Sequence, residues 1–133
     1  MIRGINHLTF AVSDLDESLA FYAETLGLSA VARWDSGAYL LAGEGWITLI
    51  ADGAAAPCPD YTHVAFTVAP EDFEAASRRA LRAGARVWQR NQSEGESLYI
   101  LDPDGHKLEL RVSGLESRLA ADRDDPPPGM RFY

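Results

Sequence analysis

A repeated segment places a histidine at the same point of each copy. Residues 6–12 read Asn-His-Leu-Thr-Phe-Ala-Val, and residues 63–68 read His-Val-Ala-Phe-Thr-Val. His7 matches His63 at an offset of 63 − 7 = 56 residues. Apolar positions alternate with others in both copies, which predicts two strands, each with one face for a core and one face that carries the histidine.

A carboxylate in a third predicted strand, residues 107–112, adds a further metal-ligand type. Two imidazoles and one carboxylate suit Mn, Fe or Zn, and fewer than four protein ligands are typical of a catalytic site. A single histidine in a strand is more often a packed or surface residue, but its repetition favours a shared role. We therefore expect His7, His63 and Glu109 to form a metal site, and we interpret His106 as a turn residue.

Other residues allow both a functional and a structural interpretation. Thr9 shares the predicted face of His7 and suits substrate contact, although a β-branched residue is also typical of any strand. Residues 91–97 are rich in oxygen donors, as in a site for a hard cation or in a solvated hairpin loop. Arg118, in a short predicted helix, is either an anion clamp or solvated. Five aromatic residues could line a cavity or belong to the core, namely Tyr39, Trp46, Tyr61, Trp88 and Tyr99.

The predicted elements follow the order βαβββ twice, which indicates an α+β domain built from tandem repeats. Repeat one covers about residues 5–51, with strands at 5–12, 28–34, 38–42 and 46–51 and a helix ending at Thr25. Repeat two covers about residues 60–112, with strands at 62–68, 86–89, 97–101 and 107–112 and a helix between Pro70 and Gly84. A linker at 52–59 joins them, and residues 113–133 form a C-terminal helix and tail of the same single domain, 1–133. We expect the two sheets to form an open, cup-like barrel lined by the histidine faces.

Composition excludes several classes of protein. The formal net charge of −8 argues against nucleic-acid binding, which needs a basic surface. No apolar run reaches the roughly 18 residues of a membrane span, and no secretion-signal pattern is present. Cys58 is the only cysteine, so we expect no disulfide framework and a reducing, cytoplasmic location.

Several motifs together resemble the vicinal oxygen chelate (glyoxalase/bleomycin resistance/dioxygenase) superfamily, and within it the FosA-type fosfomycin-resistance glutathione transferases. The most specific are Asn6-His-Leu-Thr9, Ala32-Arg-Trp34, Asp60-Tyr-Thr-His63, Ser93-Glu-Gly95, Leu101-Asp-Pro-Asp-Gly-His-Lys-Leu-Glu109 and Ser117-Arg-Leu119. The resemblance implies that His7, His63 and Glu109 bind Mn(II). It also implies a strand-exchanged homodimer, in which His7 reaches the metal of the partner chain.

The resemblance further implies roles in opening the fosfomycin epoxide with glutathione. Arg118 would hold the phosphonate, Tyr99 and Thr9 would contact the substrate, Trp46 would pack on its apolar part, and Tyr39 would favour the glutathione thiolate. The loop would bind potassium through matching residues, namely Asn91, Ser93, Glu94, Gly95 and Ser97.

Two positions depart from the family pattern. Gln89 stands near the phosphonate in place of a lysine, and Pro127 stands in place of a tyrosine. Arg90 is adjacent to Gln89, but neighbours on a strand point to opposite faces, so we do not expect it to replace that lysine. A lost charged hydrogen bond of about 1.5–3 kcal/mol predicts weakened turnover. The alternatives are epoxide hydrolysis, with Glu44 as the nearest acidic candidate for a base, and drug binding without catalysis.

Overall fold

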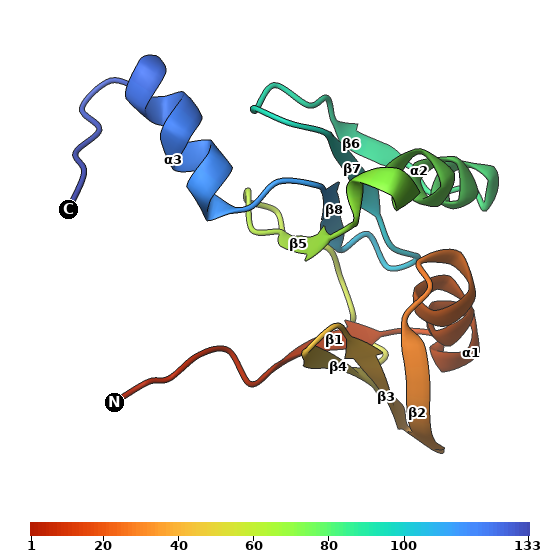
Figure 1. The fold of residues 1–133 in the computed structure, drawn as a ribbon. Coiled ribbons are helices and arrows are strands. Elements are labelled where there is room, and N and C mark those ends of the chain that lie inside the picture. Colours follow the sequence, from red (N-terminus) through yellow and green to blue (C-terminus); the bar gives the residue numbers. More distant parts are fainter.

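The computed structural model describes residues 1–133 as two four-stranded sheets with helices packed against them (Figure 1). The first unit contains β1 (His7–Val12), α1 (Leu15–Leu19), the π-helical segment η1 (Ala20–Thr25), β2 (Ser29–Trp34), β3 (Gly37–Ala42) and β4 (Gly45–Ala51). The second contains β5 (Val64–Thr67), the 3-10 turn η2 (Pro70–Asp72), α2 (Phe73–Arg82), β6 (Val87–Gln89), β7 (Ser97–Leu101) and β8 (Lys107–Arg111). Helix α3 (Leu115–Asp124) and an irregular tail follow.

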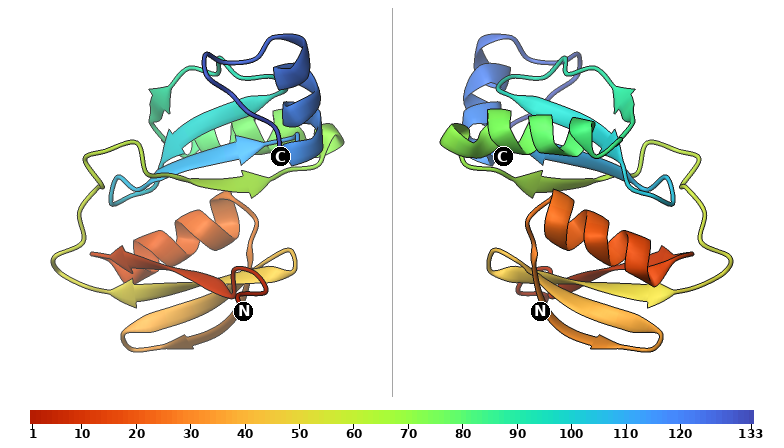
Figure 2. Two further views of the ribbon diagram at one scale, coloured as in Figure 1. Left: turned by 90° about the vertical axis from the view of Figure 1, so that its left-hand side faces the viewer. Right: turned by 90° about the vertical axis from the view of Figure 1, so that its right-hand side faces the viewer.

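The two sheets have the same topology. Their strand orders are β1-β4-β3-β2 and β5-β8-β7-β6. In each, the first strand runs parallel to the last, and the remaining pairs are antiparallel. This confirms the α+β class and the duplicated βαβββ unit. Figure 2 shows α1 between the strands of the two sheets, and no strand pairing joins the sheets within one chain.

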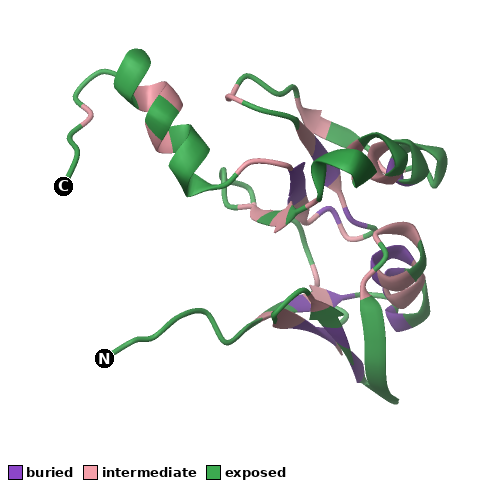
Figure 3. Ribbon diagram, viewed as in Figure 1, coloured by how far each residue is buried: buried purple, intermediate pink, exposed green.

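Alternation along the strands produces one core shared by both units. Phe10 and Leu49 from the first sheet belong to the same buried cluster as Ile100 and Leu108 from the second. Burying a side chain of this size stabilises the fold by about 1.5–3 kcal/mol. Figure 3 shows the buried residues along the strands and on α1, with β2 exposed along its whole length. The core therefore uses one face of each sheet and leaves the other face for function.

The ends of several elements follow local chemistry. The Asp14 side chain accepts a hydrogen bond from the Glu17 backbone N–H at 3.0 Å and so caps α1. The helical segment gives way to a left-handed residue, Gly27, whose φ is 83°. Strand β5 begins one residue after His63, later than predicted, so this histidine lies just outside the strand. None of the helices is long and apolar enough to cross a membrane.

The turn at residues 102–106 fastens the second unit to the first. The Tyr22 hydroxyl donates to Asp102 Oδ2 at 2.7 Å, and the second oxygen of Asp102 accepts the backbone N–H groups of Asp104 and His106. The His106 ring also reaches across, with Nε2 2.7 Å from the Ala11 carbonyl oxygen. Burial raises the pKa of Asp102, although these donors act in the opposite direction. His106 therefore belongs to a turn, as expected, and also links the two units.

Candidate metal and substrate site

His63 and Glu109 meet on the second sheet. Strands β5 and β8 are neighbours, and His63 Nε2 lies 3.3 Å from Glu109 Oε2. His63 Nδ1 is 2.9 Å from the Tyr61 carbonyl oxygen, which can only accept, so Nδ1 carries a proton. With Nδ1 as the donor, Nε2 faces the carboxylate oxygen, and a proton or a metal ion between Nε2 and Oε2 would join the two atoms. Nitrogen and oxygen ligands lie about 2.0–2.2 Å from a bound metal, so two donor atoms 3.3 Å apart could both contact one ion, and His63 and Glu109 would hold it.

Hydrogen bonds to Oε1 fix the orientation of the Glu109 carboxylate. Oε1 accepts the Ser97 hydroxyl at 2.6 Å and Arg111 Nη1 at 3.3 Å, which leaves Oε2 facing His63. Burial acts to raise the pKa of Glu109, but the hydrogen bond from Ser97 and the Arg111 guanidinium outweigh it, and the pKa is lowered overall. Glu109 is therefore an anion at neutral pH, the form that binds metal.

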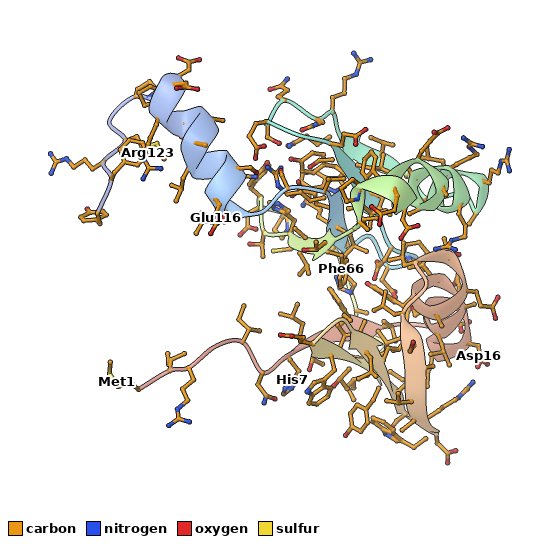
Figure 4. All side chains as sticks on the ribbon, viewed as in Figure 1. Met1, His7, Asp16, Phe66, Glu116 and Arg123 are labelled. Atoms are coloured by element: carbon orange, nitrogen blue, oxygen red, sulfur yellow. The ribbon has the colours of Figure 1, made fainter.

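His7 lies apart from this pair, on the open face of the first sheet. Its ring stacks on Trp46 with centroids 4.2 Å apart, and Nδ1 is 2.7 Å from Asn6 Oδ1, so Nε2 is free to bind. Tyr39 packs edge-on against Trp46, and Thr9 lies two residues along β1 from His7. Figure 4 shows His7 beside the first sheet, below strand β5 with Phe66. Within one chain no group of three histidine, cysteine or acidic side chains is placed to share a metal.

A cavity of about 420 Å³ opens beside the histidine and carboxylate pair on the second sheet. Three residues predicted to bind substrate, Gln89, Tyr99 and Arg118, line it together. It lies next to His63, because the Tyr61 ring that lines it is 5.0 Å from the His63 ring between centroids. The seven lining residues are Tyr61, Gln89, Arg90, Gln92, Ser93, Tyr99 and Arg118. The cavity is thus polar and carries two arginines.

Arg90 corrects one of the expectations from sequence. It lines the same cavity as Gln89 instead of pointing away, because β6 ends at Gln89 and the alternation of a strand does not extend to the next residue. Gln89 Nε2 donates to the Tyr61 hydroxyl at 2.9 Å, so its amide is already tied to the cavity wall. Pro127 lies in the tail after α3 and is not among the lining residues.

The first sheet, the whole of β5 and Leu110 of β8 line a larger cavity, of about 640 Å³. His7, Trp46 and Glu44 lie on this side, away from Arg118. Glu44 stands in the turn between β3 and β4 and is exposed. The residues predicted for one site are therefore split within the chain, with His7, Thr9, Tyr39 and Trp46 on one sheet and the others on or beside the second.

The loop at residues 91–97 does not fit a bound potassium ion. The Gly95 carbonyl oxygen accepts a hydrogen bond from Asn91 Nδ2 at 2.8 Å. Asn91 Oδ1 in turn accepts hydrogen bonds from the backbone N–H and the hydroxyl of Ser93. The hydroxyl oxygens of Ser93 and Ser97 accept from Arg111 Nη1 at 2.9 and 3.1 Å. A second cation 4 Å from this guanidinium would be repelled by about 4 kcal/mol at an effective dielectric constant of 20.

Most of the chain matches the model of a known protein family. The Glyoxalase/Bleomycin resistance protein/Dioxygenase superfamily matches residues 4–110. The chain belongs to this superfamily. Membership accounts for the paired βαβββ units and for open sheet faces that carry the site residues.

Relatives within the superfamily narrow the group. The chain is 54% identical over 136 residues to "Glutathione transferase FosA" of Serratia marcescens, covering 99% of this chain and 96% of the relative. It is 34% identical to "Metallothiol transferase FosB" of Staphylococcus haemolyticus, covering 100% and 99%. The fosfomycin resistance protein FosX of Listeria monocytogenes has a TM-score of 0.77 at 29% identity, covering 91% and 99%. A single-residue mutant of the same FosX, at 28% identity and TM-score 0.77 over 90% and 99%, was solved with Mn(II) and 1S,2S-dihydroxypropylphosphonic acid. Within the superfamily the chain is a Fos protein.

Three site residues were missed or undervalued from sequence. Arg90 and Tyr61 line the polar cavity, and Arg111 lies inside the loop beside Glu109. Arg111 follows Glu109 by two residues in a strand, so the period of two could have placed it on the same face. No comparable signal marked Arg90, because its position depends on where β6 ends.

Proposed function

We propose that this Fos protein is a metal-dependent glutathione transferase that opens the epoxide ring of fosfomycin and so confers resistance. The observation that carries the proposal is the His63 and Glu109 pair, which opens beside a cavity with two arginines. The similarity to a FosA glutathione transferase supports the thiol, and the manganese in the FosX complex supports Mn(II) at the pair.

The cavity suits a small phosphonate. A phosphate-like group carries about −1.5 to −2 charge at pH 7, and arginine matches its oxygens with a planar fork of donors. Arg118 and Arg90 would donate to these oxygens, while the Tyr61 and Tyr99 hydroxyls and the Gln89 amide would orient the group. Arg90 would then restore the positive charge that Gln89 lacks.

The reaction needs an electrophile and a thiolate. A divalent ion at His63 and Glu109 would act as a Lewis acid toward the epoxide oxygen. A free thiol has a pKa of about 8.5, so a hydrogen bond from Tyr39 to the sulfur would favour the thiolate of glutathione. The sulfur–carbon bond forms as the carbon–oxygen bond of the epoxide breaks, and the released oxygen takes up a proton. Trp46 and Thr9 would hold the small carbon skeleton of the substrate.

We infer that the working protein is a homodimer in which the first sheet of one chain covers the second sheet of its partner. His7 and Tyr39 lie on an open face that also exposes Trp34 and Leu41, an apolar surface suited to burial. In a two-fold dimer each site would combine the partner's first sheet with the His63 and Glu109 pair. The potassium ion predicted from the resemblance is not part of this proposal, because the Arg111 guanidinium already binds the loop oxygens that would hold it.

Hydrolysis of the epoxide is the second candidate. It is favoured by the diol phosphonate in the FosX complex, since this compound corresponds to addition of water to an epoxide. The carboxylate suggested for it, Glu44, lies in an exposed turn on the first sheet. It therefore has no contact with the second-sheet cavity in one chain.

Drug binding without catalysis is the third candidate. The proposed metal ligands His63 and Glu109 argue against it, because a binding protein without catalysis does not need them.

Product mass distinguishes the three functions. Protein loaded with Mn(II) is incubated with fosfomycin and glutathione, and we expect the mass of fosfomycin plus glutathione. Addition of water alone would identify a hydrolase, and unchanged fosfomycin with measurable binding would identify a binder. His63→Ala should abolish adduct formation. Arg82→Ala, an exposed change on α2, is the matched control and should leave it unchanged.

A further inference from the structure

The strongest unexplained feature is a buried arginine inside the loop at residues 91–97. Arg111 lies on β8, two residues after Glu109, and is only 7% exposed. All three guanidinium nitrogens donate hydrogen bonds. Nε binds the Ser113 carbonyl at 3.0 Å, Nη1 binds the Ser93 and Ser97 hydroxyls, and Nη2 binds the Glu94 carbonyl at 3.1 Å and pairs with the Glu94 carboxylate.

These acceptors form the kind of oxygen cage that binds a hard monovalent cation. Hydroxyl, carbonyl and carboxylate oxygens surround the guanidinium, and most of them come from Ser93, Glu94 and Ser97, three of the five residues expected to bind potassium. Arginine stays charged at any physiological pH, so the cage holds a permanent positive charge. Glu94 is turned inward to the guanidinium, and its carboxylate also accepts from the Ser113 hydroxyl at 3.1 Å.

We propose that Arg111 is the built-in cation of this loop and that it makes the enzyme independent of potassium. The guanidinium joins the loop to the metal pair, because Nη1 also donates to Glu109 Oε1. It thereby holds Glu109 with Oε2 toward His63, and through Ser93 it shapes the cavity that Arg118 lines. Arg111 is a positioning residue, since it acts through Glu109 and the loop.

One arm of the test needs no catalysis, so it stands apart from the proposed function; the activity arm rests on that function. The melting temperature of metal-free protein is measured in potassium chloride and in choline chloride of equal ionic strength. The wild type should melt at the same temperature in both salts. Arg111→Ser removes the charge and leaves the oxygen cage, so potassium should raise its melting temperature above that in choline.

The activity arm uses the same two salts. Wild-type turnover of fosfomycin with glutathione should not depend on potassium, whereas potassium should raise the reduced activity of Arg111→Ser by about 5- to 150-fold, the usual range of coupling between two sites. Arg111→Lys keeps the charge and should remain independent of potassium, with lower activity because the fork of donors is lost. Arg82→Ser, an exposed arginine on α2, is the matched control and should behave as wild type.

A specific effect of potassium on the melting temperature or turnover of the wild type would overturn the proposal. So would an Arg111→Ser variant that folds and gains no response to potassium in either arm. If that variant does not fold, the wild type and Arg111→Lys still decide, because either of them responding to potassium would contradict a built-in cation.

Discussion

The two sheets share a topology but present different faces. On the second sheet Glu109 is 3% exposed and is hydrogen-bonded to Ser97 and Arg111, whereas on the first sheet Tyr39 is 39% exposed. The strand register shows at which position the two sheets differ. Thr9 pairs with Thr48 as Ala65 pairs with Glu109, and Ala65 follows Thr9 by the repeat offset. The first unit therefore has a threonine, Thr48, where the second has the carboxylate that we propose binds metal.

This difference supports the proposal that each unit supplies half of a site. The second sheet has a histidine, an anionic carboxylate and an arginine that fixes it, all hydrogen-bonded before any substrate arrives. The first sheet has a histidine with a free Nε2 and three neighbours that suit a substrate, but no acid beside it. In the proposed dimer, the first sheet of one chain would supply to the second sheet of its partner the groups that the second sheet lacks.

The largest effect should come from removing the histidine of each sheet in a separate variant and then mixing the two variants. His7→Ala and His63→Ala should each lower metal affinity and turnover by more than about 100-fold, the upper range for loss of an outer-shell partner. Mixed under conditions that exchange subunits, the two variants should regain about a quarter of wild-type activity, because half of the dimers are mixed and each has one intact site.

The control for this complementation is a pair of variants in the same half. His63→Ala mixed with Glu109→Ala leaves a defect on the second sheet of every chain, so no site can be intact and activity should stay absent. Glutathione adduct formation measures all mixtures. Failure of the first mixture to recover, with subunit exchange verified by differently tagged chains, would contradict a site shared between chains.

A smaller effect is expected from the arginines that line the second-sheet cavity. Arg118→Ala removes charged hydrogen bonds of about 1.5–3 kcal/mol, which corresponds to a loss in kcat/KM of about 10- to 150-fold. Arg90→Ala should fall in the lower part of that range, because this exposed side chain is not held by any other residue of the cavity. Neither change touches His63 or Glu109, so manganese affinity should be unchanged.

Kinetics of the two single variants decide whether Arg90 belongs to the substrate site. The Arg82→Ala control removes an exposed charge from α2 and reports any general electrostatic effect. A normal kcat/KM for Arg90→Ala would show that Gln89 leaves the cavity with one working cation, and that the second-sheet face is less complete than proposed.

Strand periodicity was enough to predict most of this comparison. The alternation around His7 and His63 indicated two equivalent strands, and the structure has both, although β5 begins one residue after His63. Glu109 was expected to join the histidines from a third predicted strand, and its Oε2 lies 3.3 Å from His63 Nε2. Strand inferences of this kind are dependable because a strand fixes which side a residue occupies, whatever the rest of the chain does.

Features that depend on ends and loops could not be predicted in the same way. Arg90 lies one residue past β6, and a boundary that shifts by one residue reverses the side on which a residue lies. Arg111 could be placed on a face, but its contacts with Ser93 and Glu94 depend on how the loop at residues 91–97 folds back. The separation of His7 from Glu109 depends on how the two sheets pack, which periodicity does not describe.

The smallest effect concerns the contact that joins the two units. Tyr22→Phe removes the hydroxyl that donates to Asp102 Oδ2 and leaves a buried carboxylate oxygen without this partner. The free energy of unfolding should fall by about 1–3 kcal/mol at neutral pH, measured by urea denaturation. Tyr133→Phe, at the exposed C-terminus, is the control and should have no effect.

The pH dependence of this loss gives the sharper test. Burial raises the pKa of Asp102 in the folded protein above its ordinary value of 3.8, so the folded state holds the proton more tightly than the unfolded chain. Stability from this group therefore increases as the pH falls through the folded pKa toward the unfolded value of 3.8, and is lost as the pH rises through the folded pKa. The Tyr22 hydrogen bond opposes that shift, and its removal raises the pKa further. The deficit of Tyr22→Phe should shrink as the pH is lowered, because protonation relieves the unpartnered charge, and a deficit that is constant or grows on acidification would contradict the bond as the link between the two units.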